Sequence, residues 1–176
     1  MTTEAPLAAP TGPPSIDAQA RLLILIDAFG ANGVEGRMKL AKLDFLLRYP
    51  DRFAQLMESR APGLPLGENP WLTGAIEQRM IRYRYGPWDP AYYGLLGALI
   101  GKGLITTQQN GSVATYVASS AGHQVAGALA ATDSWEAVRE RARLLRRHFN
   151  LTGTSLKDLI YETFPDIVNA DWGTHL

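Results

Sequence analysis

The chain has 176 residues, of which 46% are hydrophobic, and its 17 lysines and arginines balance 17 aspartates and glutamates. This length and apolar content predict one domain with a substantial core and short appendages. A formal net charge of zero excludes a global field that draws the chain to nucleic acid or membrane, so such binding requires a local patch. The absence of cysteine excludes disulfides and thiolate metal sites.

The N-terminal segment, residues 1–15, reads MTTEAPLAAPTGPPS. It lacks the basic start and apolar run of a signal peptide, and its Pro, Thr and Ala content predicts a disordered lead-in. The apolar run Leu22–Ile26 is far too short to span a bilayer. We therefore expect a soluble, cytoplasmic protein without a membrane partner.

The first half of the chain predicts three helices. Asp17 is expected to cap a helix that runs to about Ala31, and apolar residues cover much of this helix, which predicts a central position in the core. A second helix is expected from about Met38 to Tyr49, where Pro50 ends it. Asp51 is then expected to cap a short third helix.

The middle of the chain predicts a loop over 61–70, a short helix over 71–79 and an extended segment. In this extended segment Ile81, Tyr83 and Tyr85 alternate with Arg82 and Arg84, which predicts one apolar and one basic side.

A turn at Gly86-Pro87 should lead to a further helix. Asp89-Pro90 is a strong helix start, and the helix is expected to run to Lys102 and stop at Gly103.

Two short segments, 104–109 and 112–118, flank Asn110-Gly111, the strongest short signal for a type I′ hairpin. Ser120 can cap a helix over 121–131. The order of helices followed by a β-hairpin predicts a mainly α (α+β) fold: a winged helix-turn-helix domain over 16–132, with the hairpin as its one wing.

A C-terminal helical extension and tail are expected over 133–176. Its first helix carries an apolar seam on an otherwise arginine-rich surface, with Trp135, Val138, Ala142, Leu145 and Phe149 at spacings of three and four. A last helix is expected to begin near Thr154 or Ser155 and to end before Pro165.

Catalytic signals are weak. The three histidines lie on separate predicted elements, and HExxH, P-loop and strand-linked GxGxxG motifs are absent. Asp44, within an apolar helix, suits a structural ion pair with Lys39, Lys42 or Arg48 better than a catalytic role. We predict a non-enzymatic protein without a metal or other cofactor.

The helix before the hairpin normally enters the DNA major groove in a winged helix. Here it reads PAYYGLLGALIGK and offers only Lys102 for base readout. Instead Gly94, Gly97, Ala98 and Gly101 form a stripe of small residues. Glycine costs about 1 kcal/mol in a helix interior, so this stripe predicts close approach by another helix, either of the same domain or of a partner.

Basic residues fall into several sets, either solvated and paired or directed at phosphates. The candidates for nucleic-acid backbone contacts, without sequence reading, are Arg37, Lys39, Lys42, Arg82, Arg84 and Lys102.

The seam residues Trp135, Val138, Leu145 and Phe149 must be covered, either by the domain itself or by a partner subunit or second copy. The tail that holds Phe164 and Trp172 is a candidate anchoring peptide.

Three stretches together, KLAKLDFLLRYP, MIRYRYGPWDPAYYGLLGALIGKGLI and SLKDLIYETFPDIV, resemble the winged-helix middle components of bacterial ABC three-component systems. The resemblance covers the chain from Ile16 onward. It implies an adaptor that links an SMC-like ABC ATPase to a companion subunit in an anti-phage defence complex.

A second resemblance is to the Panacea antitoxin domain, in which a KLxKLxY helix is followed by a YGP turn and a helix. Lys39 to Leu43 and Tyr85-Gly86-Pro87 match this pattern, whereas Phe45 and Tyr49 stand out of register with its aromatic residue. It implies the alternative function, a DNA-binding transcriptional regulator or antitoxin.

Overall fold

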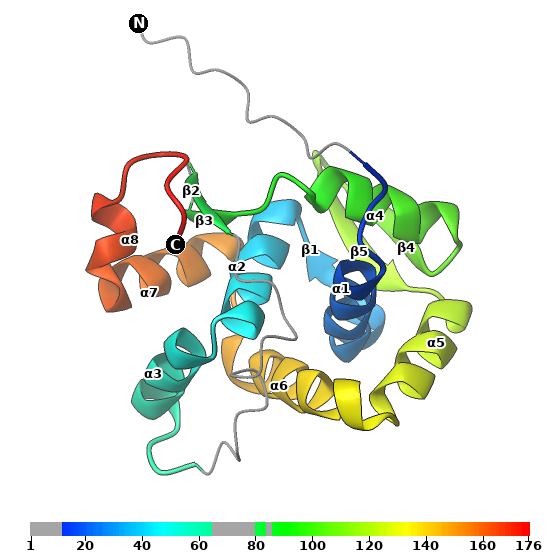
Figure 1. The fold of residues 1–176 in the computed structure, drawn as a ribbon, viewed down its shortest axis with the longest axis horizontal. Helices are drawn as coiled ribbons and strands as arrows, with labels where there is room; N and C mark the ends of the chain where they lie inside the picture. Colours follow the sequence, from blue (N-terminus) through cyan, green and yellow to red (C-terminus); the bar gives the residue numbers. More distant parts are fainter. Residues whose placement is uncertain (1–11, 65–79, 84–85) are drawn as a thin grey trace, which may run out of the picture.

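The computed structural model describes residues 12–64, 80–83 and 86–176, and within them the chain is mainly helical with small antiparallel sheets (Figure 1). The helix expected over 71–79 and the side chain of Arg84 lie outside the described residues. None of the helices described is long and apolar enough to cross a membrane.

The helices follow the sequence periodicity closely. They are α1 (Ile16–Ala28), α2 (Arg37–Arg48), α3 (Pro50–Arg60), α4 (Tyr92–Gly101), α5 (Ser120–Ala130), α6 (Asp133–Phe149), α7 (Gly153–Thr163) and α8 (Pro165–Asn169), with a 3-10 turn η1 (Gly30–Asn32) after α1.

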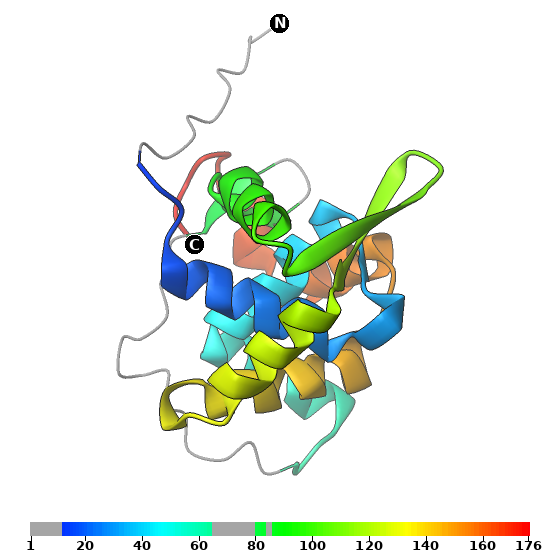
Figure 2. The ribbon, with the colours of Figure 1, turned by 90° about the vertical axis from the view of Figure 1, so that its right-hand side faces the viewer.

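The strands form two sheets. The larger sheet has the order β1-β5-β4, in which β1 (Val34–Glu35) and β4 (Ile105–Asn110) both pair antiparallel with β5 (Val113–Ala118). The hairpin of β4 and β5 projects from the helical body (Figure 2). The smaller sheet pairs β2 (Ile81–Tyr83) with β3 (Gly86–Trp88).

Helix α1 lies at the centre of the core, as its composition predicts. It packs against α4, α5, α6 and β5, and Leu22, Leu25 and Ile26 are fully buried. Because neighbours surround α1 on several sides, nearly all of its middle residues are enclosed, which explains an apolar surface too broad for an ordinary amphipathic helix.

A buried ion cluster ties α1, α2 and α4 together around Asp44. Its carboxylate accepts hydrogen bonds from Arg21 Nε at 2.8 Å and from the Tyr92 hydroxyl at 2.7 Å, and Arg48 lies 3.4 Å away. Arg48 also pairs with Asp89 at 2.7 Å. Burial alone would raise the pKa of Asp44, but the two guanidinium groups and these hydrogen bonds hold the pKa below its usual range.

Several predicted helix starts are wrong by one or two residues. Ser15, not Asp17, caps α1, because its hydroxyl accepts from the Ala18 amide at 3.3 Å. Helix α3 begins at Pro50 itself, whose fixed φ and missing N–H suit the first helical position, so Asp51 lies in the first turn. Ser119 and Thr152 cap α5 and α7.

The start of α4 also differs from the prediction. The Asp89 carboxylate accepts from the Ala91 amide at 2.9 Å, so Asp89-Pro90 forms a turn and the helix begins two residues later, at Tyr92. The predicted stop is confirmed, because Gly103 has a φ of 70° and its amide donates to Ile100 O.

Neither predicted turn lies where the sequence places it. Asn110 pairs with Val113, so the hairpin loop is Gly111-Ser112. Only Gly111 has positive φ there, which excludes a type I′ turn because that turn needs two such residues. Gly86 and Pro87 belong to β3 rather than to a turn, since they pair with Tyr83 and Arg82.

Candidate functional site

One side of α4 is exposed and made of small and apolar residues. Tyr93 is 60% exposed and Ile100 is 44% exposed. A Cβ built on Gly97 or Gly101 meets no described residue within 4 Å, whereas at Gly94 it meets Pro14 at 3.6 Å. Packing against the described part of the chain therefore does not account for the glycines at 97 and 101. We call Tyr93, Gly97, Ile100 and Gly101 the α4 face.

The α4 face carries none of the side chains that read base edges. Within α4, which the structure describes in full, Arg, Lys, Asn and Gln are absent. Lys102 follows the helix, and its Nζ donates to Gln19 Oε1 at 2.7 Å, so it is held against α1. Ala98 of the predicted stripe is half-buried.

The α6 seam is covered by the chain's own helices. Val138, Leu145 and Phe149 are buried where α6 packs against α1, α2 and α5, and Trp135 is half-buried. These residues form core in this conformation rather than an open partner surface.

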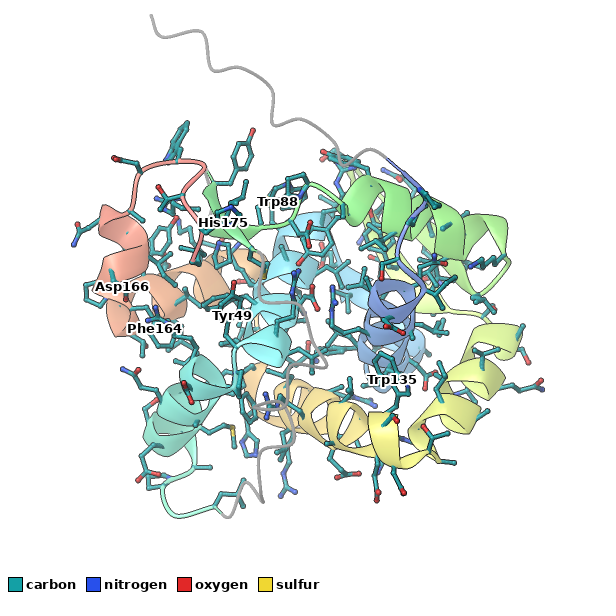
Figure 3. All side chains as sticks on the ribbon, viewed as in Figure 1. Tyr49, Trp88, Trp135, Phe164, Asp166 and His175 are labelled. Carbon is teal, nitrogen blue, oxygen red and sulfur yellow. The ribbon has the colours of Figure 1, made fainter. Side chains whose placement is uncertain are left out.

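The tail residues predicted to anchor a partner have two different environments. Phe164 is buried against Phe45 at 6.2 Å between ring centroids, whereas Trp172 is 50% exposed and 6.3 Å from Tyr83. Trp135 and Phe164 lie toward opposite ends of the molecule (Figure 3). The residues predicted for partner binding therefore do not form one surface.

Arg82 is buried instead of lining a basic side. The C-terminal tail covers its strand: the Arg82 amide donates to Thr174 O at 2.8 Å, and the Gly173 amide donates to Arg82 O at 2.7 Å. Its guanidinium donates to Tyr83 O and lies 5.3 Å from the Tyr161 ring centroid. Only 7% of Arg82 is exposed, so the expected contact with nucleic acid does not fit this structure.

Three predicted phosphate-binding residues, Arg37, Lys39 and Lys42, line one groove of about 790 Å³. We call it the basic groove. Its walls are the start of α2, the side of the β4–β5 hairpin and the segment that joins α6 to α7. Its charged and polar lining includes Glu35, Arg37, Lys39, Lys42, Asn150 and Lys157.

The start of α7 approaches the start of α2 at this groove. A Cβ built on Gly153 would lie 3.7 Å from the Lys39 amide nitrogen. Lys39 Nζ donates to Asn150 Oδ1 at 2.9 Å, which fixes the preceding segment against α2. The groove is therefore assembled from parts of the chain more than one hundred residues apart.

Burial depresses the pKa of two lysines in the basic groove. Desolvation, together with the charge of Lys157, lowers the pKa of Lys42 to about 8. Desolvation also lowers the pKa of Lys39, and Glu35 opposes that shift. Both shifts arise mainly from the burial of the two ammonium groups, and only at Lys42 does a neighbouring cation, Lys157, add to the effect.

Two groove residues, Lys157 and Asn150, are not predicted from the sequence. Asn150-Leu151-Thr152 separates two helices and reads as an ordinary loop, and Lys157 reads as an exposed helix residue. The capping threonine marks where α7 begins, but local sequence gives no sign that this end meets α2.

The candidate catalytic carboxylate Asp44 has a structural role, and a metal site is absent from the described residues. Asp44 is completely buried with its acceptors occupied, so its partners are Arg48, as predicted, and Arg21, which the sequence did not indicate. Over residues 12–64, 80–83 and 86–176, no three His, Asp or Glu side chains gather as a metal site.

Comparisons with protein-family models, with curated proteins and with solved structures give no match to this chain. The α4 face and the basic groove are the two candidate binding surfaces among the described residues.

Proposed function

We propose that the chain is a non-enzymatic adaptor that docks a partner protein through the α4 face. The observation that carries this proposal is the exposure of Tyr93, Gly97 and Ile100 on a helix without base-reading side chains. Exposed glycines cost helix stability, and they allow another backbone to approach closely. An aromatic residue beside them supplies the apolar contact area typical of interface anchors.

The arrangement around α4 supports a winged-helix assignment. Helix α1, strand β1 and helix α2 come first, α4 immediately precedes the β4–β5 hairpin, and β1 pairs with β5. In this assignment β4–β5 is the wing and α4 holds the position of a DNA-reading helix. An apolar surface at that position favours protein docking over base readout.

The resemblance to middle components of ABC three-component systems suggests the partner. We propose an SMC-like ABC ATPase or its companion subunit, within a prokaryotic anti-phage defence complex. The chain would connect the two, and the basic groove would supply contacts to a nucleic-acid backbone.

Gly97→Leu tests the docking proposal. The position is open, so the leucine projects from the α4 face without disturbing the core. We expect the variant to keep the wild-type circular dichroism spectrum and to lose the partner in a pull-down from cells that express the neighbouring genes. Ala128→Leu, which places the same leucine side chain at an exposed position on α5, is the control and should retain the partner. Equal retention of the partner by both variants would show that the α4 face does not dock it.

The second candidate function is a DNA-binding transcriptional regulator or antitoxin that acts as a homodimer. The basic groove beside the β4–β5 hairpin favours it, because a wing and adjacent cations commonly contact phosphates. It predicts sequence-dependent binding of the chain's own promoter by the purified protein. Equal affinity for promoter and scrambled duplexes at fixed salt would count against it.

A further inference from the structure

We propose that the basic groove is a binding site for the phosphate group of a nucleotide, either free or within a nucleic-acid strand. The site would consist of Lys39, Lys42 and Lys157 with the adjoining starts of α2 and α7. This inference specifies the ligand of the basic groove and does not depend on partner docking by α4.

The charge of the groove is strongly one-sided. Its lining contains four cationic side chains and one carboxylate, that of Glu35. Glu35 is exposed, and its negative charge opposes the lowering of the pKa of Lys39. Among described residues, the only carboxylate paired with Lys157 is its neighbour Asp158, at 3.5 Å. A multivalent anion would supply the missing counter-charge.

The environment of Lys42 favours an anion in the basic groove most clearly. It is 2% exposed, and among the described residues its Nζ donates only to Met38 O of its own helix, at 3.2 Å. Within the described residues no carboxylate pairs with it. Buried ammonium groups are costly unless they are paired, and the depressed pKa of Lys42 records that cost. An anion beside Nζ would offset the cost of desolvation and further favour the charged form.

The two helix starts reinforce the positive potential. The first turn of α2 lacks both a side-chain cap and an acidic residue, and it contains Arg37 and Lys39. The first turn of α7 lacks acidic residues as well. Cations at a helix N-terminus oppose the helix dipole, and an anion at the start of α2, which has no side-chain cap, would offset that cost.

The size and walls of the groove favour an organic phosphate over a bare ion. Its volume of about 790 Å³ falls within the range of small-molecule sites. Met38, Val113 and Leu151 give it apolar walls, and Gln109 and Ser112 place amide and hydroxyl groups at the hairpin end. A nucleotide combines the phosphate that the lysines require with a flat apolar base and polar edges.

Fluorescence anisotropy with a labelled single-stranded oligonucleotide, at fixed salt, tests the site on the full chain. Lys157→Gln should weaken binding by about tenfold or more, because a charge-assisted contact is lost. Arg147→Gln removes the same charge from an exposed position on α6 outside the groove, and it should change binding far less. Adenosine monophosphate and inorganic phosphate are the competitors.

Competition by adenosine monophosphate, lost in Lys157→Gln, would assign the site to a free nucleotide phosphate. Binding of the strand alone, with the same dependence on Lys157, would assign it to the phosphodiester backbone. Equal losses in Lys157→Gln and Arg147→Gln, or no binding by any probe, would overturn the proposal. Normal binding of the oligonucleotide by Gly97→Leu would show that the groove binds its ligand independently of the α4 face.

Discussion

The guanidinium of Arg37 lies over the ring of Tyr93, with 4.6 Å between the Arg37 Cζ and the ring centroid. Arg37 lines the basic groove, and Tyr93 is the aromatic residue of the α4 face. This cation–π contact joins the two proposed binding surfaces at their common border. A partner that covers Tyr93 would therefore also contact a residue of the groove.

The α4 glycines carry a cost in stability that an alanine would remove. Since a Cβ at Gly97 meets nothing within 4 Å, Gly97→Ala should raise the free energy of unfolding by about 1 kcal/mol. Urea denaturation followed by circular dichroism measures this change. A destabilised Gly97→Ala protein would mean that the position is packed, contrary to its exposure.

Helix α5 contains one tightly packed glycine and one open glycine that serves as its control. A Cβ on Gly122 would lie 1.9 Å from Leu104 O, so the helix could not stay against the start of the hairpin. Gly122→Ala should therefore lower the free energy of unfolding by about 1–3 kcal/mol. Gly127→Ala, in the same helix with nothing within 4 Å, should be neutral or stabilising. Similar thermal midpoints for the two variants would refute the packing of α5.

The buried ion cluster should dominate acid stability. Asp44→Asn leaves Arg21 and Arg48 without their shared carboxylate, and we expect a loss of about 3–5 kcal/mol in the free energy of unfolding. Because the folded-state pKa of Asp44 is below its unfolded value, its contribution is present above about pH 4. It is lost as the pH falls through the folded-state pKa. Denaturation midpoints of the wild type and Asp44→Asn should converge in acid.

Lys42 should produce the opposite pH dependence. Its folded-state pKa of about 8 lies below the usual lysine value of 10.5, so the unfolded chain binds more protons between these values. Stability of the wild type relative to Lys42→Met should therefore rise with pH across this window, by at most about 3 kcal/mol. The comparison cancels the titration of other groups. A stability difference between the two proteins that stays constant from pH 7 to 10.5 would show that the pKa of Lys42 is not lowered in the folded state.

Local signals in the sequence predict the elements better than their contacts. The seam of α6, the hairpin and the stop at Gly103 follow from spacing and glycine chemistry, and the structure contains all three. The predicted caps differ from those in the structure because several serine, threonine and aspartate residues compete near each helix start. Which hydroxyl or carboxylate reaches an amide depends on the backbone angle at one residue.

Long-range pairings set the candidate sites, and sequence patterns do not encode them. Arg21 meets Asp44 across 23 positions, and Lys39 meets Asn150 across 111. Arg82 looked exposed from its alternation with tyrosines, but the tail pairs with its strand. Periodicity predicts which face of an element is apolar, whereas it does not say which distant segment will cover that face.

The most direct test of the adaptor account is co-purification of the tagged chain, expressed with its native neighbouring genes, followed by mass spectrometry. We predict stoichiometric recovery of an SMC-like ABC ATPase or its companion subunit. Elution of the chain alone, as a monomer or a homodimer, would contradict the account and favour a free-standing regulator.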